Sequence, residues 1–209
     1  MLQYLDENQL SPPYILVAHS YGGTFARLFL EQRPHQVAGM VLVETGQETA
    51  IDPDIEQRQY KTQVLGGKPL AVIRGNTLIA KWKQYQQALA VAGDAPNPTL
   101  IIQKQLLDAT DKEDERLKRA QLQLSRNNRY IHIPDCGHGV IQHRPDAVKE
   151  AVCWVMENQQ TQNGEKQKNE SQEYEEQGSE NVVKKSIRAR LREAKKMPLV
   201  GNITRLLGR

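Results

Sequence analysis

Residues 14–23 read Tyr-Ile-Leu-Val-Ala-His-Ser-Tyr-Gly-Gly, and this stretch decides the fold class that the sequence predicts. The first five residues form a short apolar run without an amphipathic period, which is typical of a strand buried on both faces. A helical pattern follows over residues 21–32, with Phe25, Leu28 and Phe29 on one side. A buried strand that passes directly into a helix begins a strand–helix–strand unit, and such units build parallel sheets.

Strands and helices alternate along the rest of the first 156 residues. The patterns predict strands at residues 37–43, 70–74 and 129–133, and helices at residues 78–91, 99–124 and from Pro145 onward. This alternation predicts an α/β fold, with a mainly parallel sheet of about four strands flanked by helices.

The long helix predicted over residues 99–124 carries two charged pairs. Asp114 precedes Lys118 and Glu115 precedes Arg119, each by four residues with the acid first. Because this order is favourable on the surface of a helix, we expect both pairs on an exposed face.

A serine stands at the junction between the first strand and the first helix. Ser20 has the small residues Ala18 and Gly22 two positions to either side, and Gly23 follows. Small residues at these positions favour a sharp turn that holds the serine in a strained conformation, with its hydroxyl above the strand ends. The helix N-terminus adds free N–H groups and a positive dipole end for a developing oxyanion. The alternative interpretation is a serine that only caps the helix.

This junction resembles the nucleophile elbow G-x-S-x-G of the α/β-hydrolase family, with Ala18 in place of the first glycine. The resemblance implies that Ser20 is a nucleophile, that the backbone N–H of Tyr21 is an oxyanion donor, and that Ala18, Gly22 and Gly23 form the turn. It implies an esterase-like serine hydrolase that acts on a small-molecule ester, thioester or amide of unknown identity, with no metal and no cofactor. A serine nucleophile argues against dehalogenation.

A serine hydroxyl needs a base at neutral pH, and the sequence offers five histidines. His138 lies in residues 135–139, Asp-Cys-Gly-His-Gly, between the last predicted strand and the final helix. This loop resembles the one in which α/β hydrolases place their catalytic histidine, so His138 is the predicted base. We expect the side chain of His19 to point away from the hydroxyl. A metal site of His132, His138 and His143 is not favoured, because none of them pairs at i, i+4 on a helix.

The third member of the triad is predicted to be Glu44. In most of the family an acid follows the strand that corresponds to residues 70–74, but here Gly-Asn-Thr follows it. Glu44 ends the second strand, where a minority branch resembling the haloalkane dehalogenases places its acid. A carboxylate there would accept the second N–H of His138 and fix its tautomer. The alternatives are an acid that only caps the following loop, or one of Asp135, Asp94 and Asp108 as the triad acid.

The resemblance covers about residues 1–156 and begins in the middle of the family's fold. The earlier strands, and the His-Gly-type loop that supplies a second oxyanion N–H, have no counterpart here. We therefore expect one of two situations. Either this is a truncated hydrolase that has lost about 3 kcal/mol of transition-state stabilisation with the missing oxyanion donor, or another chain supplies the missing half of the fold. The first strand would have an apolar free edge prone to self-association. Residues 46–64 and 65–68 are the remaining candidates for a lid.

Charge divides the chain into three parts. Residues 1–156 are neutral, residues 157–181 carry a net charge of −5, and residues 182–209 carry +8. The middle part is rich in Gln, Asn and Glu, so we expect a disordered acidic linker. The last part is basic and amphipathic, which suits an anionic membrane surface. It has no aromatic residue for base stacking, and we expect no nucleic-acid partner.

Composition excludes several classes of protein. Two cysteines among 209 residues cannot form a disulfide framework, and no apolar run is long enough to span a membrane. No signal peptide is visible, which favours a cytoplasmic protein with peripheral membrane attachment. The alternative function is a non-catalytic hydrolase remnant that acts as a binding or membrane-associated protein.

Overall fold

The computed structural model describes residues 2–46, 51–93 and 97–159. The predicted linker (157–181) and basic tail (182–209) lie outside these residues, except that residues 157–159 continue a helix. In that last turn the side-chain amide of Asn158 donates to the carbonyl of Trp154 at 2.9 Å.

Four parallel strands form the sheet in the described part of the chain. They are β1 (Tyr14–His19), β2 (Val37–Val43), β3 (Leu70–Arg74) and β4 (Asn128–His132). Their spatial order is β1-β2-β3-β4, so every strand pairs with the next one in the sequence. The predicted α/β class and four-stranded parallel sheet are therefore confirmed. β1 forms one edge of the sheet, where Val17 is 48% exposed.

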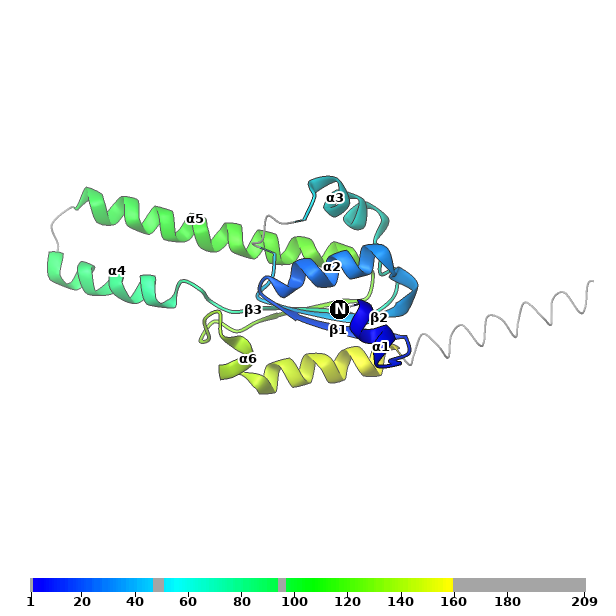
Figure 1. Cartoon of the computed structure of the whole chain (residues 1–209). Helices are drawn as coiled ribbons and strands as arrows, with labels where there is room; N and C mark the ends of the chain where they lie inside the picture. Colours follow the sequence, from blue (N-terminus) through cyan, green and yellow to red (C-terminus); the bar gives the residue numbers. More distant parts are fainter. Residues whose placement is uncertain (1, 47–50, 94–96, 160–209) are drawn as a thin grey trace, which may run out of the picture. The chain divides into compact units, whose positions relative to one another are not determined.

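Helices cover both faces of this sheet (Figure 1). Figure 1 shows α2, α3 and part of α5 on one side, with α6 and the helix of residues 145–159 on the other. Among the described residues, no helix is long and apolar enough to cross a bilayer. The helical elements are α1 (Leu2–Glu7), α2 (Gly22–Gln32), η1 (Pro34–Gln36), α3 (Pro53–Thr62), α4 (Ile79–Ala92), α5 (Pro98–Ala120), η2 (Gln121–Leu124) and α6 (Val140–His143).

Alternating side chains of the central strands build two separate hydrophobic cores. On one face, Leu42 and Val72 pack with Leu30 of α2. On the other face, Val43 and Ile73 pack with Val155 of the C-terminal helix. Because the strands are buried on both faces, their sequences are continuously apolar rather than alternating. The carboxyl ends of the strands are thereby held in fixed positions relative to one another.

Helices α4 and α5 form a hairpin that projects away from the sheet (Figure 1). They pack against each other through a third apolar cluster that includes Tyr85 and Leu107. The C-terminal part of α5 returns to the sheet and contacts β3. The hairpin therefore attaches to the sheet directly beside the end of β3.

One expectation for α5 is wrong, because the Asp114–Lys118 pair is buried rather than exposed. Asp114 is 4% exposed and Lys118 is fully buried, and their ion pair measures 2.9 Å. Arg74, at the end of β3, also reaches Asp114 and so encloses the pair. Glu115–Arg119 lies on the partly exposed side of the helix, as predicted. The sequence spacing is the same for both pairs, so the way α5 packs against β3 decides which one is buried.

The predicted lid segment 65–68 lies at the wrong end of the sheet to cover Ser20. It precedes β3, and Lys68 donates to the carbonyl of Pro34, which precedes β2. Ser20 instead follows the carboxyl end of β1. Since all strands run parallel, these two points lie at opposite ends of the sheet.

Candidate active site

Ser20 is the first residue beyond β1 and has a strained backbone. Its φ is +53°, a left-handed conformation that costs a non-glycine residue about 1–3 kcal/mol. Two hydrogen bonds hold it there: its N–H donates to the carbonyl of Val43 at 3.0 Å, and its carbonyl accepts from Gly23 N–H at 2.9 Å. Helix α2 begins two residues later, at Gly22. The serine thus occupies a sharp strand-to-helix turn.

The steric demand of this turn lies at Gly23 rather than at Gly22. A Cβ atom on Gly23 would lie 2.7 Å from two carbon atoms of the Thr45 side chain. On Gly22 it would lie 3.9 Å from the Cβ of Ala18, which is ordinary van der Waals contact. Gly23 therefore allows the close approach between α2 and the end of β2.

Glu44 is placed at the end of β2 by the same backbone arrangement. Its φ is +52°, and its N–H donates to the carbonyl of Ile73 at 2.9 Å. The residue is 2% exposed, and its Oε1 accepts a hydrogen bond from the backbone N–H of Gly75 at 2.6 Å. Both Ser20 and Glu44 thus continue the hydrogen bonding of the sheet by one residue past their strands. This places the two side chains at neighbouring strand ends.

His138 lies between these two residues. Its Nε2 is 2.9 Å from the Oγ of Ser20, and its Nδ1 is 3.3 Å from the Oε2 of Glu44. A carboxylate oxygen only accepts, so Nδ1–H donates to Glu44 and Nε2 is left to accept from the serine hydroxyl. The imidazole is 50% exposed, whereas the side chain of Glu44 is fully buried. A substrate can therefore approach the serine side of the imidazole from solvent.

Two residues that sequence analysis did not select also contact the histidine or its loop. The Nε2 of His19 donates to the backbone carbonyl of His138 at 2.9 Å. The two imidazole rings lie with centroids 4.7 Å apart. Asn76, after β3, donates from its side chain to the carbonyl of Pro134 at 3.2 Å. No local signal in the sequence indicates these contacts, which join residues far apart in the chain.

The other acids weighed for the triad lie elsewhere or are not described. Asp135 is exposed and pairs with Arg144 at 2.9 Å. Asp108 pairs with Lys104 on the exposed surface of α5. Asp94 lies outside the described residues. Of the candidate acids in the described part of the chain, Glu44 is the one that contacts His138.

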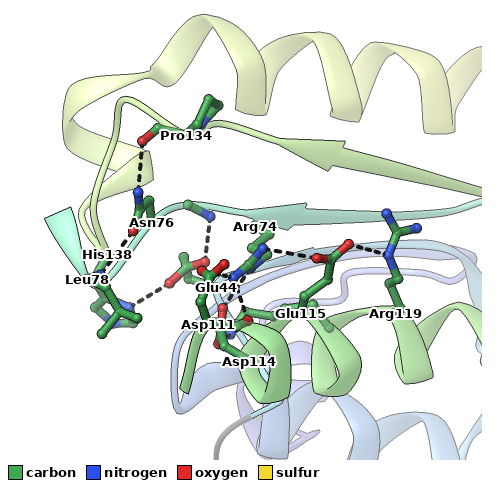
Figure 2. A network of polar contacts seen from close by, with 12 residues as sticks. Glu44, Arg74, Asn76, Leu78, Asp111, Asp114, Glu115, Arg119, Pro134 and His138 are labelled. Atoms are coloured by element: carbon green, nitrogen blue, oxygen red, sulfur yellow. Dashed lines mark hydrogen bonds and ion pairs between the residues drawn. The ribbon is translucent and has the colours of Figure 1, made fainter. Parts of the chain in front are cut away.

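A buried ion cluster lies next to the acid (Figure 2). The guanidinium of Arg74 contacts Asp114 at 2.8 Å and Asp111 at 2.6 Å, and the longer contact to Glu115 measures 3.7 Å. Burial disfavours the charged form of Arg74, but its bonds to Asp114 and Asp111 outweigh this and raise its pKa above the ordinary value. The cluster therefore keeps its charges and anchors the end of β3 to α5. Gly75, whose N–H reaches Glu44, is the next residue.

The arrangement has the parts that acyl transfer needs. A hydroxyl faces an imidazole, the imidazole faces a buried carboxylate, and the N–H of Tyr21 lies at the start of α2. N–H groups in the first turn of a helix have no intrahelical acceptor, so they favour negative charge nearby. Within the described ranges, no group of three or more His, Cys, Asp or Glu side chains is placed to hold a metal ion.

Comparisons with known proteins agree with this fold. A family model described as "alpha/beta hydrolase fold" matches residues 1–78, which include Ser20 and Glu44, and indicates a hydrolase-type domain. "Probable transporter efuK" of Hormonema carpetanum is 22% identical over an alignment that covers 73% of this chain and 30% of that protein. The chain thus spans less than a third of the length of the curated relative it matches. The family match over residues 1–78 and the parallel sheet between two helical layers both support the α/β-hydrolase superfamily for this chain.

Proposed function

We propose that this chain is a serine hydrolase that cleaves esters by acyl transfer through Ser20, His138 and Glu44. The observation that carries the proposal is the 2.9 Å contact between Ser20 Oγ and His138 Nε2, residues 118 positions apart in the chain. Close contact of a hydroxyl with the acceptor nitrogen of an imidazole is what activation of a serine requires. The left-handed backbone of Ser20 supports the same conclusion, since such strain concentrates at functional sites.

In the acylation step, Ser20 Oγ attacks the carbonyl carbon of the ester while its proton moves to Nε2 of His138. Glu44 stabilises the resulting imidazolium through Nδ1–H. The oxyanion of the tetrahedral intermediate accepts a hydrogen bond from Tyr21 N–H. Collapse of the intermediate breaks the ester C–O bond, and the leaving alkoxide takes the proton from Nε2. The products are an alcohol and an acyl-serine.

Deacylation repeats these steps with water as the nucleophile. His138 takes a proton from the water, whose oxygen attacks the acyl carbon, and then returns that proton to Ser20 Oγ. The carboxylic acid leaves and the free serine is restored. The half-exposed imidazole allows water to reach the acyl group. We therefore propose hydrolysis of the acyl-serine rather than transfer to a larger acceptor.

A fluorophosphonate probe tests the proposal because it reacts only with an activated serine. We expect labelling of the wild-type chain at Ser20, found by mass spectrometry of the modified peptide. Ser20→Ala and His138→Ala should both prevent labelling. His143→Ala is the matched control, because His143 is exposed and its ring contacts the carbonyl of Gly139 rather than the serine. An unlabelled wild-type chain with an intact circular dichroism spectrum would refute the proposal.

A second candidate function, membrane attachment, is favoured by the charge of the C-terminal residues. The +8 charge of residues 182–209 follows a segment of −5, and clustered basic residues bind anionic lipid surfaces. We expect the full chain to float with vesicles that contain phosphatidylserine but not with pure phosphatidylcholine vesicles. Deletion of residues 182–209 should abolish flotation while fluorophosphonate labelling persists. Flotation that survives the deletion would exclude this segment as the attachment site.

A further inference from the structure

The last residue of β3, Arg74, and the two residues after it contact the triad acid and the segment that carries the triad histidine. Arg74 accepts at its carbonyl from Ile133 N–H at 2.8 Å, and Gly75 donates its N–H to Glu44. Asn76 donates its backbone N–H to the carbonyl of Cys136 at 2.6 Å. The chain around Gly75 also lies very close to the histidine loop, since a Cβ there would be 2.6 Å from the carbonyl oxygen of Gly137.

The side chain of Asn76 makes two further contacts in opposite directions (Figure 2). Its Nδ2 donates to the carbonyl of Pro134 at 3.2 Å, and its Oδ1 accepts from Leu78 N–H at 3.1 Å. An asparagine amide can do both at once because it carries a donor and an acceptor. Aspartate would retain the acceptor for Leu78 and lose the donor for Pro134. The first contact holds the histidine loop, and the second orders the start of α4.

We infer that Asn76 is a positioning residue that holds the loop of residues 134–138 so that His138 contacts Ser20 and Glu44 together. The inference rests on the proposed function of these three residues. Asn76 fixes the loop at two carbonyls, while His19 fixes the carbonyl of His138 itself. The Glu44–His138 contact, at 3.3 Å, is longer than a charge-assisted hydrogen bond usually is. It therefore depends on where the loop places the ring.

The thiol of Cys136 offers a measurement of this loop that needs no enzyme activity. Cys136 is 5% exposed and lies within the loop, and the other cysteine, Cys153, is exposed and can be replaced by serine. In the Cys153→Ser background, the reaction of Cys136 with a thiol-reactive aromatic disulfide reports how often the loop opens. We expect Asn76→Asp to speed this reaction about tenfold, because a hydrogen bond that closes the loop is lost.

Kinetics with a p-nitrophenyl ester form the second measurement. We expect Asn76→Asp to lower kcat by about 10- to 100-fold, since a misplacement of about 1 Å costs on the order of 100-fold. KM should change little, because Asn76 is expected to act on the ring and not on the substrate. The low-field NMR signal of the His138 Nδ1 proton should broaden in the same variant. A purely structural role would move the thermal midpoint but not these signatures.

Asn128→Asp is the matched control. The side chain of Asn128 also donates to two backbone carbonyls, those of Ser125 at 2.8 Å and Leu122 at 3.2 Å, but it lies at the start of β4. This variant should leave Cys136 reactivity and kcat at wild-type values. Should Asn76→Asp fail to fold, Asn76→Ser also removes the amide donor, with a smaller change, and is tested in the same way.

The outcomes separate the two proposals. If the wild type does not hydrolyse the ester, the proposed function fails, and Cys136 reactivity together with the Nδ1 proton signal still decides the role of Asn76. Unchanged Cys136 reactivity in Asn76→Asp overturns the inference. So does a faster Cys136 reaction with kcat and the Nδ1 signal at wild-type values, because the loop would then open without displacing the ring.

Discussion

Glu44 and Asp114 are two acids buried to nearly the same degree beside the end of β3, yet their partners differ. Asp114 contacts two buried cations, Arg74 at 2.8 Å and Lys118 at 2.9 Å. Glu44 contacts a backbone N–H and a half-exposed imidazole. The positive charge near Asp114 is permanent, whereas the positive charge near Glu44 can appear and disappear with one proton. Burial alone therefore does not distinguish the proposed catalytic acid, Glu44, from the structural acid Asp114; the chemistry of their partners does.

The largest expected effect is on the rate when Glu44 becomes Gln. The amide retains an oxygen for Gly75 N–H but cannot stabilise an imidazolium, and it favours the wrong histidine tautomer. We expect kcat for ester hydrolysis to fall by about 10⁴-fold, with a small change in stability. Asp108→Asn, on the exposed surface of α5, is the control and should leave kcat unchanged. Equal rates for wild type and Glu44→Gln would remove Glu44 from the triad.

The next effect is on stability when Asp114 becomes Ala. Arg74 is 2% exposed and Lys118 is fully buried, so the loss of Asp114 leaves the charges of both side chains poorly compensated. We expect the free energy of unfolding to fall by about 3–5 kcal/mol, measured by urea denaturation. Asp108→Ala removes an acid from an exposed pair on the same helix and should shift the midpoint little. Similar losses in the two variants would show that the buried cluster does not anchor β3.

A smaller effect is expected from packing at the turn that carries Ser20. In Gly23→Ala, the new methyl group would collide with Thr45, the residue after Glu44, at 2.7 Å. We expect a loss of about 1–3 kcal/mol in the free energy of unfolding. Gly22→Ala meets only ordinary contact with Ala18, and we expect it to be neutral or to stabilise by up to about 1 kcal/mol. If thermal denaturation shows Gly22→Ala to be less stable than Gly23→Ala, the contact with Thr45 is not what requires a glycine in this turn.

The smallest effect concerns a third acid of the same neighbourhood, Glu115. A hydrogen bond from Arg119 lowers the pKa of the Glu115 carboxyl below 4.5. Partial burial opposes this shift, and the charges of Arg119 and Arg74 add to it. A carboxyl whose pKa is lower in the folded state than in the unfolded state stabilises the fold at pH values above its unfolded-state pKa. This stability is lost as the pH falls through the folded-state pKa. Glu115→Gln should therefore flatten the decline in urea midpoint between about pH 5 and about pH 3. If the urea midpoint of Glu115→Gln declines with pH as it does in the wild type, other carboxylates cause the decline.

Much of the fold could be predicted because the strands of this sheet are continuously apolar and end at recognisable turns. Residues 37–43 and 70–74 were predicted with their observed bounds, and the strand–serine–helix junction was found from residues 14–23. The family resemblance, not spacing, selected Glu44 and His138. Their proximity depends on parallel strand order, which brings the carboxyl ends of different strands to one edge.

What could not be predicted depends on contacts between residues far apart in the chain. Spacing along α5 indicates a surface pair but cannot show that Arg74, 40 residues earlier, encloses Asp114. Asn76 looks like an ordinary turn residue, because its partner Pro134 lies 58 positions away. The contact between His19 and the histidine loop could not be predicted either, because its partner, the carbonyl of His138, lies 119 positions away. The expectations for residues 160–209 lie outside the described residues.

The spatial order of the strands, identical to their order in the sequence, has a consequence for synthesis on the ribosome. Each new strand finds its neighbour already made, so the sheet can grow one strand at a time as the nascent chain emerges. The serine and the acid are in place once β3 has joined, and the histidine arrives only with the loop after β4. On the proposed mechanism, the base is therefore the last of the three residues to be made. Ester cleavage by a nascent chain would begin only after translation has passed β4 and the loop that follows it.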